Sequence, residues 1–367
     1  MAGMRETIAR LTAVTAESAA DVDRLRAILV AAGQWEHAAV ASGEVEGETI
    51  AALRDLTDCA ADAFCLAWRL QSTLGPRPAA NLATYEMADP ILEQVAPWID
   101  GVSAQLAAVP ASEAALTVEI CAGFDRFGLY PEQYAEAAQL WCRNHGGLTA
   151  AARAAVAGVN AIGSTLSAVV AGVLRLNGWR VSRFGVRLEG DASSPRVTPA
   201  TAEIGSVGVS TFVLIVDGDP AEGAAAMSAT AEAFAACGID RRRVSYFPST
   251  EETVDPTASY RMPRSDVRMG WGTLIHRLAT RTVEHFAATC SLRDVAIDEL
   301  GESIPSYRIA MPDGRALIWR FAGVSVEADG VPTAEFRMAE LSRGAEAGLT
   351  EAPVDMALGF IASPSVV

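Results

Sequence analysis

The chain has 367 residues, half of them apolar; 29 are basic and 45 are acidic, so the net charge is −16. All 29 basic residues are Arg, which excludes the protein classes whose chemistry needs a Lys: Walker-type phosphate loops, Schiff-base enzymes, protein kinases and penicillin-binding-type enzymes. The acidic balance argues against a general nucleic-acid coat, and the apolar fraction excludes bulk disorder.

Residues 1–176 are expected to be helical. Ala, Leu and Glu dominate this part, and its apolar residues recur at spacings of three and four. Capping signals predict helices over 19–32, ended by Gly33 as a C-terminal cap, over 59–74, and over 132–144.

Residues 154–174 carry no charged side chain, and Arg153 and Arg175 flank them. A helix of this length would span a bilayer. However, polar residues such as Asn160 and Ser164 interrupt the segment, and small residues recur four apart, as in closely packed helices. We therefore expect a central helix buried by the other N-terminal helices and no stable membrane span, with membrane insertion as the alternative.

From residue 177 onward, Gly, Pro, Thr and Val become more frequent and alternating patterns predict strands. The apolar run 209–216 is typical of a buried parallel strand. With helix 221–237 and strand 243–247 it predicts a β-α-β unit of a ferredoxin-like or a short doubly wound sheet. The other predicted elements are strand 179–188, helix 272–290, strands 307–311, 316–321, 324–328 and 334–339, and a hairpin turn at 312–314.

The predicted fold class is therefore α+β. An all-helical part, residues 1–176, ends in the buried apolar helix 154–174. A mixed α/β part, residues 177–367, combines the β-α-β unit with antiparallel hairpins. Residues 173–290 hold 13 Arg and 13 acidic residues, so the segments on either side carry the whole acidic excess.

Two carboxylates, Asp217 and Asp219, directly follow the predicted strand 209–216. Proteins with parallel sheets bind ligands at the carboxyl ends of the strands, and such a pair can hold Mg²⁺ beside a phosphate. The stretch resembles the first motif of haloacid-dehalogenase-type phosphohydrolases and the metal-binding pair of many glycosyltransferases. That resemblance implies a Mg-dependent phosphoryl- or glycosyl-transfer enzyme in which Asp217 and Asp219 are catalytic metal ligands. An ordinary strand-to-helix turn is the alternative.

Two groups of arginines are candidates for phosphate or nucleic-acid contacts. Arg forks bind phosphate and carboxylate through two parallel hydrogen bonds. The alternative is ion pairing with the acidic helical part, within the chain or between subunits. The candidates are Arg180, Arg183 and Arg187, and the run Arg241, Arg242 and Arg243.

Metal and cofactor motifs are scarce. Cys142 and His145 are spaced C-x-x-H, but no second pair lies nearby, so we expect no zinc site and no resident cofactor. The six cysteines form no C-x-x-C pair, and residues 1–20 show no secretory signal. Together these features favour a cytoplasmic protein with free thiols.

The absence of site motifs favours a non-catalytic, self-assembling structural or interaction protein, such as a capsid-like shell, coat or scaffold subunit. Its partner would be itself, because the acidic helical part of one subunit complements the Arg-bearing part of another. RNA or phosphate contact through the Arg groups is a further expectation. The alternatives are the Mg-dependent transferase and a membrane-inserting protein that uses residues 154–174.

Overall fold

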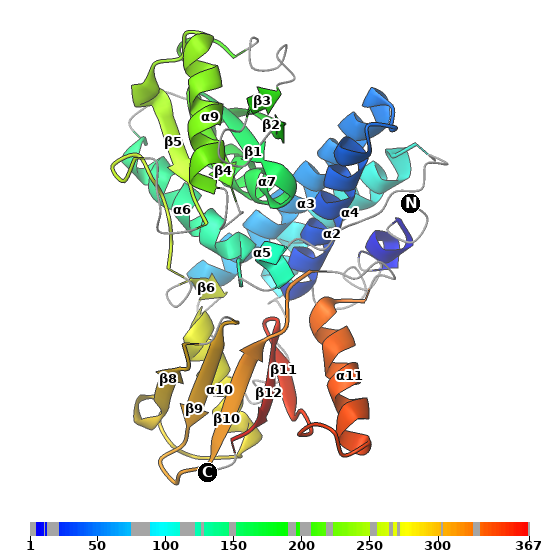
Figure 1. The fold of residues 1–367 in the computed structure, drawn as a ribbon, viewed down its shortest axis with the longest axis vertical. Coiled ribbons are helices and arrows are strands. Elements are labelled where there is room, and N and C mark those ends of the chain that lie inside the picture. Colours follow the sequence, from blue (N-terminus) through cyan, green and yellow to red (C-terminus); the bar gives the residue numbers. More distant parts are fainter. Residues whose placement is uncertain are drawn as a thin grey trace.

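A computed structural model confirms the α+β class, with helices in the N-terminal part followed by parallel and antiparallel sheets (Figure 1). In Figure 1 the parallel sheet and the helices around it occupy the upper part of the molecule, and the antiparallel sheet occupies the lower part. The structure describes residues 5–10, 12, 22–74, 89–110, 122–125, 128–146, 152–189, 196–198, 207–217, 223–249, 255–263, 267–269, 272–301, 304–325 and 331–365.

The first sheet has the order β3-β2-β1-β4-β5, and all its strands are parallel except the edge strand β3. Helix α7 connects β1 to β2, and α9 connects β4 to β5 on the other face, so the sheet is doubly wound. The predicted β-α-β unit over 209–247 is confirmed as β4-α9-β5. The elements are β1 (Arg153–Val159), α7 (Asn160–Leu176), β2 (Arg180–Glu189), β3 (Arg196–Thr198), β4 (Phe212–Asp217), α9 (Gly223–Ala236) and β5 (Val244–Phe247).

The predicted helix 154–174 is wrong in its first third. Residues 153–159 form β1, which lies between β2 and β4, and only then does α7 begin. A strand buried on both faces is as continuously apolar as a buried helix, and the Ala-rich composition here favoured the helix. The predicted join near 176–178 therefore falls inside the β1-α7-β2 unit. Among the described residues, no helix is long and apolar enough to cross a membrane.

A layer of helices covers the face of the parallel sheet on which α7 lies (Figure 1). Gly33, predicted as a helix end, lies inside the first long helix of this layer. A Cβ atom there would lie 2.0 Å from Oγ1 of Thr165 in α7, so glycine allows the two helices to approach closely. The layer comprises α2 (Val22–Ser42), α3 (Gly47–Leu74), α4 (Asp89–Ala108), α5 (Ala122–Asp125) and α6 (Pro131–Asn144).

The second sheet is antiparallel, in the order β11-β12-β10-β9-β8. The hairpin predicted at 312–314 is confirmed by the bond from Gly314 N–H to the Met311 carbonyl, 3.0 Å long. The predicted strand 334–339 is wrong, because these residues lie in α11. In the predicted strand 324–328, residues 324 and 325 are not in a strand and the rest lie outside the described part. The elements are β6 (Arg268–Met269), β7 (Gly272–Thr273), α10 (Leu274–His285), β8 (Ala296–Glu299), β9 (Ser306–Ala310), β10 (Ala316–Phe321), α11 (Thr333–Glu346), β11 (Asp355–Ala357) and β12 (Phe360–Pro364).

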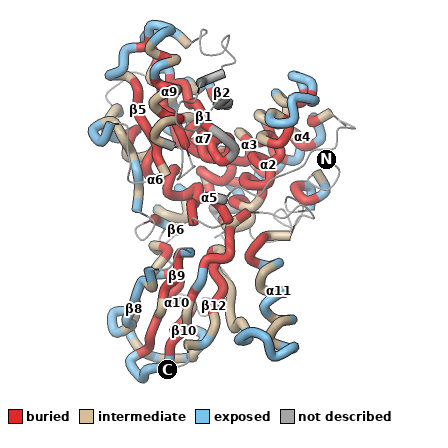
Figure 2. Tube along the Cα trace, in the orientation of Figure 1, coloured by how far each residue is buried: buried red, intermediate tan, exposed pale blue. Residues whose placement is uncertain are grey.

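Buried residues run through β1, β4 and α7 and through the inner strands of the second sheet (Figure 2). Polar contacts join the two regions. The Tyr130 hydroxyl donates to the Leu358 carbonyl at 2.6 Å, and Arg337 of α11 pairs with Asp125 of α5 at 2.6 Å.

Candidate functional site

Asp217 lies at the carboxyl edge of the parallel sheet, as predicted, and its side chain is fully buried. The Tyr134 hydroxyl donates to the backbone carbonyl of Asp217 at 2.9 Å. Burial and the Asp217 charge raise the pKa of the Tyr134 phenol, so this hydroxyl stays protonated. Asp219 lies outside the described residues, and among those described no three His, Cys, Asp or Glu side chains cluster as metal ligands. The Mg pair thus stays a prediction.

The turn from β1 to α7 is a feature that sequence reasoning missed. A Cβ on Gly158 would lie 2.3 Å from the Gly163 carbonyl oxygen, so the strand and the helix touch through two glycines. The spacing G-x-x-x-x-G followed by Ser164 and Thr165 is that of a phosphate loop with Ser in place of its Lys. Thr165 packs against Gly33, so α2 of the helical layer contacts the N-terminal part of α7. The glycine spacing could have indicated this turn, but the predicted helix 154–174 placed Gly158 and Gly163 inside one continuous helix.

Arg183 of β2 points into the helical layer rather than toward solvent. Its Nη1 and Nη2 lie 3.1 and 2.9 Å from the two carboxylate oxygens of Glu36, and its Nε lies 2.7 Å from Asp58. The carbonyls of Ser164 and Arg54 accept the remaining two N–H groups. All five N–H donors of Arg183 are therefore occupied within the chain, so its guanidinium is not available to a phosphate. Arg183 instead links β2 to the helical layer.

Burial and the neighbouring carboxylates act in opposite directions on the pKa of Arg183. Desolvation alone would lower the pKa of the Arg183 guanidinium, but the carboxylates of Glu36 and Asp58 outweigh it and raise that pKa. A second pair, Arg175 with Asp62 at 2.7 Å, joins the end of α7 to α3 in the same way. Part of the Arg-to-acid complementarity expected between subunits is thus satisfied within one chain.

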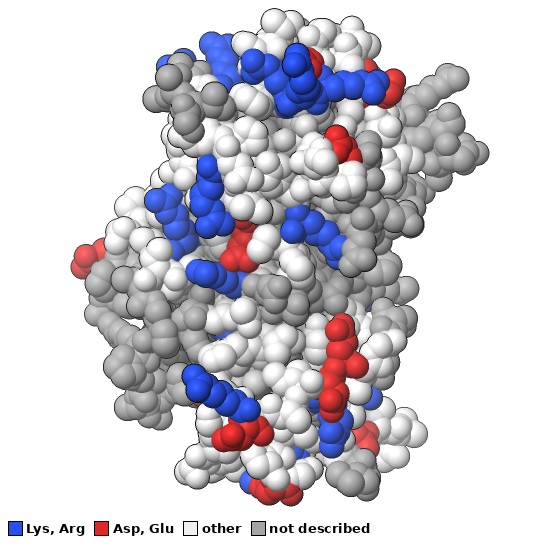
Figure 3. Space-filling view, turned by 90° about the vertical axis from the view of Figure 1, so that its left-hand side faces the viewer, with Lys and Arg blue, Asp and Glu red and all other residues white. Residues whose placement is uncertain are grey.

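The run 241–243 directly precedes β5, so it lies at the N-terminal ends of the parallel strands, opposite the end at which Asp217 lies. Arg241 pairs with Glu232 at 2.8 Å and Arg242 with Asp240 at 2.6 Å, both on the surface. Arg243 donates to the Ser210 carbonyl at 2.7 Å, and its guanidinium lies 5.0 Å from the centre of the Phe212 ring. Figure 3 shows Arg side chains gathered at the end of the molecule that holds the parallel sheet. Arg187 lies in β2, but its side chain is outside the described part.

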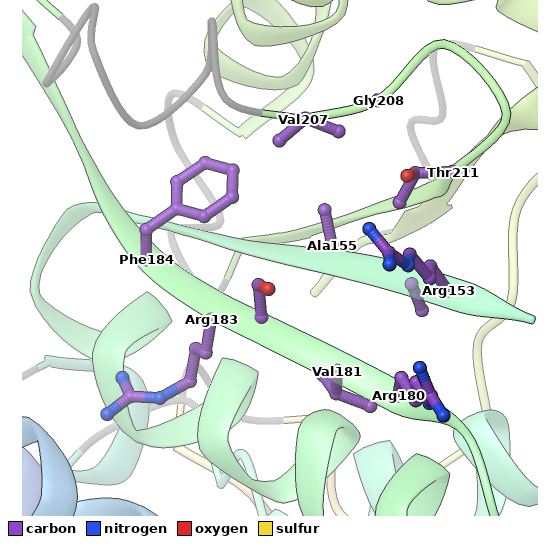
Figure 4. A pocket seen from close by; sticks show the side chains of 11 residues that line it. Arg153, Ala155, Arg180, Val181, Arg183, Phe184, Val207, Gly208 and Thr211 are labelled. Carbon is purple, nitrogen blue, oxygen red and sulfur yellow. The ribbon is translucent and has the colours of Figure 1, made fainter. Parts of the chain in front are cut away.

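A pocket of about 390 Å³ lies at the N-terminal ends of these strands, on the face of the sheet that α9 covers (Figure 4). Arg153 and Arg180 lie at its mouth as register partners, because they occupy paired positions of the adjacent parallel strands β1 and β2. Both side chains are exposed, and neither forms a hydrogen bond or ion pair with any residue that the structure describes. Sequence reasoning proposed Arg180 but missed Arg153, because it placed residue 153 at a helix end.

The pocket has a charged end and an apolar end (Figure 4). Arg153 and Arg180 lie at one end together with Thr211, and Phe184 and Val207 lie at the other. The described lining contains no Asp or Glu. Two like charges on directly paired strand positions repel each other, and an anion between them would relieve that repulsion. The complete described lining is Arg153, Ala154, Ala155, Arg180, Val181, Ser182, Arg183, Phe184, Val207, Gly208 and Thr211, of which Arg183 directs its side chain away.

No family model, curated protein or solved structure matches the chain. The arrangement of its residues is therefore the basis for assigning a function. The described lining of the arginine pocket offers guanidinium and hydroxyl donors, but no His, Cys, Asp or Glu that could act as a base or a nucleophile. The guanidinium and hydroxyl donors of this lining are suited to holding an anion.

Proposed function

We propose that the protein binds a small anionic ligand, with a phosphate or carboxylate group held between Arg153 and Arg180. The observation that carries the proposal is the pairing of these two exposed guanidiniums on adjacent strands, over a pocket without acidic lining. Arg forks recognise such groups through paired, charge-assisted hydrogen bonds. Arg180 is one of the phosphate contacts expected from the sequence.

The shape of the site favours a small molecule over a polynucleotide. A volume of about 390 Å³ lies in the usual range for small-molecule pockets, roughly 300–1,000 Å³. The net charge of −16 repels a long polyanion, whereas a compact ligand meets only the local positive field. The nearby Arg241 and Arg242 already pair with acidic side chains, which weakens an extended basic surface.

The proposal is tested by thermal unfolding in increasing inorganic phosphate at low salt, because a ligand that binds only the folded state raises the melting temperature. We expect this rise in the wild type and in Arg293→Gln, which removes an exposed arginine from the other region. Arg153→Gln and Arg180→Gln should lose most of it. Equal rises in all four proteins would contradict the proposed site.

Self-association, the function expected from the sequence, is a second candidate. The observation that favours it is a set of exposed apolar side chains on and after α11: Phe336 and Leu341 on the helix, and Leu349, which is 80 % exposed. A groove of about 540 Å³ lies beside them, between α11 and the second sheet. Apolar patches of this kind mark contact surfaces, and a second copy of the chain would cover them in a homo-oligomer.

A further inference from the structure

We infer that the ligand of the arginine pocket is a phosphate monoester carrying a flat ring, as in a phosphorylated aromatic or heteroaromatic alcohol. This inference rests on the proposed function, because it concerns the same site. It commits to both ends of the ligand: a dianionic phosphate at the arginines and a ring at the apolar end.

The charged end of the pocket fits a phosphate better than a carboxylate. Two guanidiniums from neighbouring strands lie at this end, and a single carboxylate offers only one two-oxygen face for one fork. A phosphate monoester has three terminal oxygens and a charge of about −1.5 to −2 at neutral pH, so it engages both forks. The hydroxyls of Ser182 and Thr211 add donors in the lining.

The apolar end explains why a bare phosphate underfills the pocket. Ala155, Phe184 and Val207 line it, and the Phe184 ring is held rigidly, since it is 4 % exposed and packs 5.7 Å from the Phe234 ring centre. One water molecule takes up about 30 Å³ of liquid, so a pocket of about 390 Å³ has room for a ring beyond the phosphate. An aromatic ring there would lie against the partly exposed Val207 and the small part of Phe184 that remains accessible.

Calorimetric titration of the full chain separates the two ends of the ligand. The probes are phenyl phosphate, inorganic phosphate, phenol and benzoate. We expect phenyl phosphate to bind at least about tenfold more tightly than inorganic phosphate, because only its ring gains apolar burial. Phenol should not bind measurably, and benzoate should bind more weakly than phenyl phosphate. Val207→Ser should weaken phenyl phosphate binding but leave inorganic phosphate unchanged, and it avoids disturbing the buried Phe184.

The pH dependence identifies the head group. The second pKa of a phosphate monoester is about 6, so the affinity for phenyl phosphate should rise between pH 5 and pH 7. Phenyl sulfate does not titrate in this range, so its affinity should stay constant and serves as the control.

The outcomes distinguish this inference from the proposed function. Equal affinities for phenyl phosphate and inorganic phosphate, both lost in Arg180→Gln, would overturn the ring and leave the anion site standing. Tighter binding of benzoate than of phenyl phosphate would overturn the phosphate and indicate a carboxylate ligand. Failure of all four probes to bind would overturn both proposals.

Discussion

Arg183 and Glu36 form a bidentate ion pair in the interior, and both side chains are only 1 % exposed. The pair ties β2 of the parallel sheet to α2 of the helical layer. Breaking it leaves the buried Glu36 carboxylate with only Arg54, whose Nε lies 3.7 Å away, and removing one partner of a buried pair costs about 3–5 kcal/mol. We therefore expect Arg183→Met to lower the free energy of unfolding by that amount, as measured by urea denaturation.

Two comparisons make that prediction specific. Arg180→Met changes an exposed arginine on the same strand and should alter stability by less than about 0.5 kcal/mol. The double variant Arg183→Met with Glu36→Leu should lose less than Arg183→Met alone, because no buried carboxylate remains without a counter-charge. Equal losses of unfolding free energy in Arg183→Met and Arg180→Met would contradict a stabilising Arg183–Glu36 pair.

The glycine contact at the β1–α7 turn predicts unequal effects at two paired positions. Gly158 of β1 and Gly185 of β2 are register partners. A Cβ on Gly158 would meet the Gly163 carbonyl oxygen at 2.3 Å, whereas one on Gly185 would meet nothing within 4 Å. Gly158→Ala should destabilise the protein by about 1–3 kcal/mol or more, as overpacking does, and Gly185→Ala should be neutral or slightly stabilising. Urea denaturation of both variants checks this, and equal losses would contradict the turn.

Sequence patterns predicted the elements whose periodicity or turn chemistry was unambiguous. The strand 209–216, the helix that follows it and the hairpin at 312–314 all appear in the structure. The sequence patterns gave a wrong prediction at β1, because an apolar run of Ala and Val is equally typical of a buried strand and of a buried helix. They also failed at 334–339, where alternation predicted a strand but the residues form the start of α11.

The candidate site shows a different limit. Arg180 was proposed as a phosphate contact from its residue type alone, but Arg153, with which it shares the pocket mouth, is 27 positions earlier in the chain. Only strand pairing brings the two together, and that pairing depends on β1, the strand that was missed. Arg183 shows the converse, because a local pattern of arginines cannot reveal that one of them faces the buried Glu36 and the partly buried Asp58.

The buried thiols predict a loss of stability at high pH. Burial raises the pKa of the Cys142 thiol to about 12 and that of Cys65 well above its usual range. In the unfolded chain these thiols ionise near pH 9, so above that pH the unfolded state releases protons that the folded state retains. The free energy of unfolding should therefore fall as pH rises from 9 toward 12, by up to about 1.4 kcal/mol per pH unit for each such thiol.

Urea denaturation at pH 8 and pH 10.5 measures this slope, and Cys142→Ala should reduce it. A thiol reagent at pH 8 gives an independent check, since the exposed Cys237 should react before Cys65 and Cys142. A slope that Cys142→Ala leaves unchanged would place the ionising group elsewhere.

The exposed apolar side chains around α11 predict concentration-dependent self-association. Light scattering after size-exclusion chromatography should show a mass above that of one 38.5 kDa chain. The double variant Phe336→Ser with Leu341→Ser should return the protein to a monomer, because it removes apolar surface from the proposed contact. A wild-type protein that stays monomeric at all concentrations would exclude this surface as a subunit contact.

The central claim is the anion site between Arg153 and Arg180, and calorimetric titration of inorganic phosphate at low salt tests it most directly. The wild type should bind one phosphate per chain, more weakly as salt is added, since the salt screens the exposed charges. The double variant Arg153→Gln with Arg180→Gln should show no saturable binding. Undiminished binding by the double variant, or no binding by the wild type, would contradict the account.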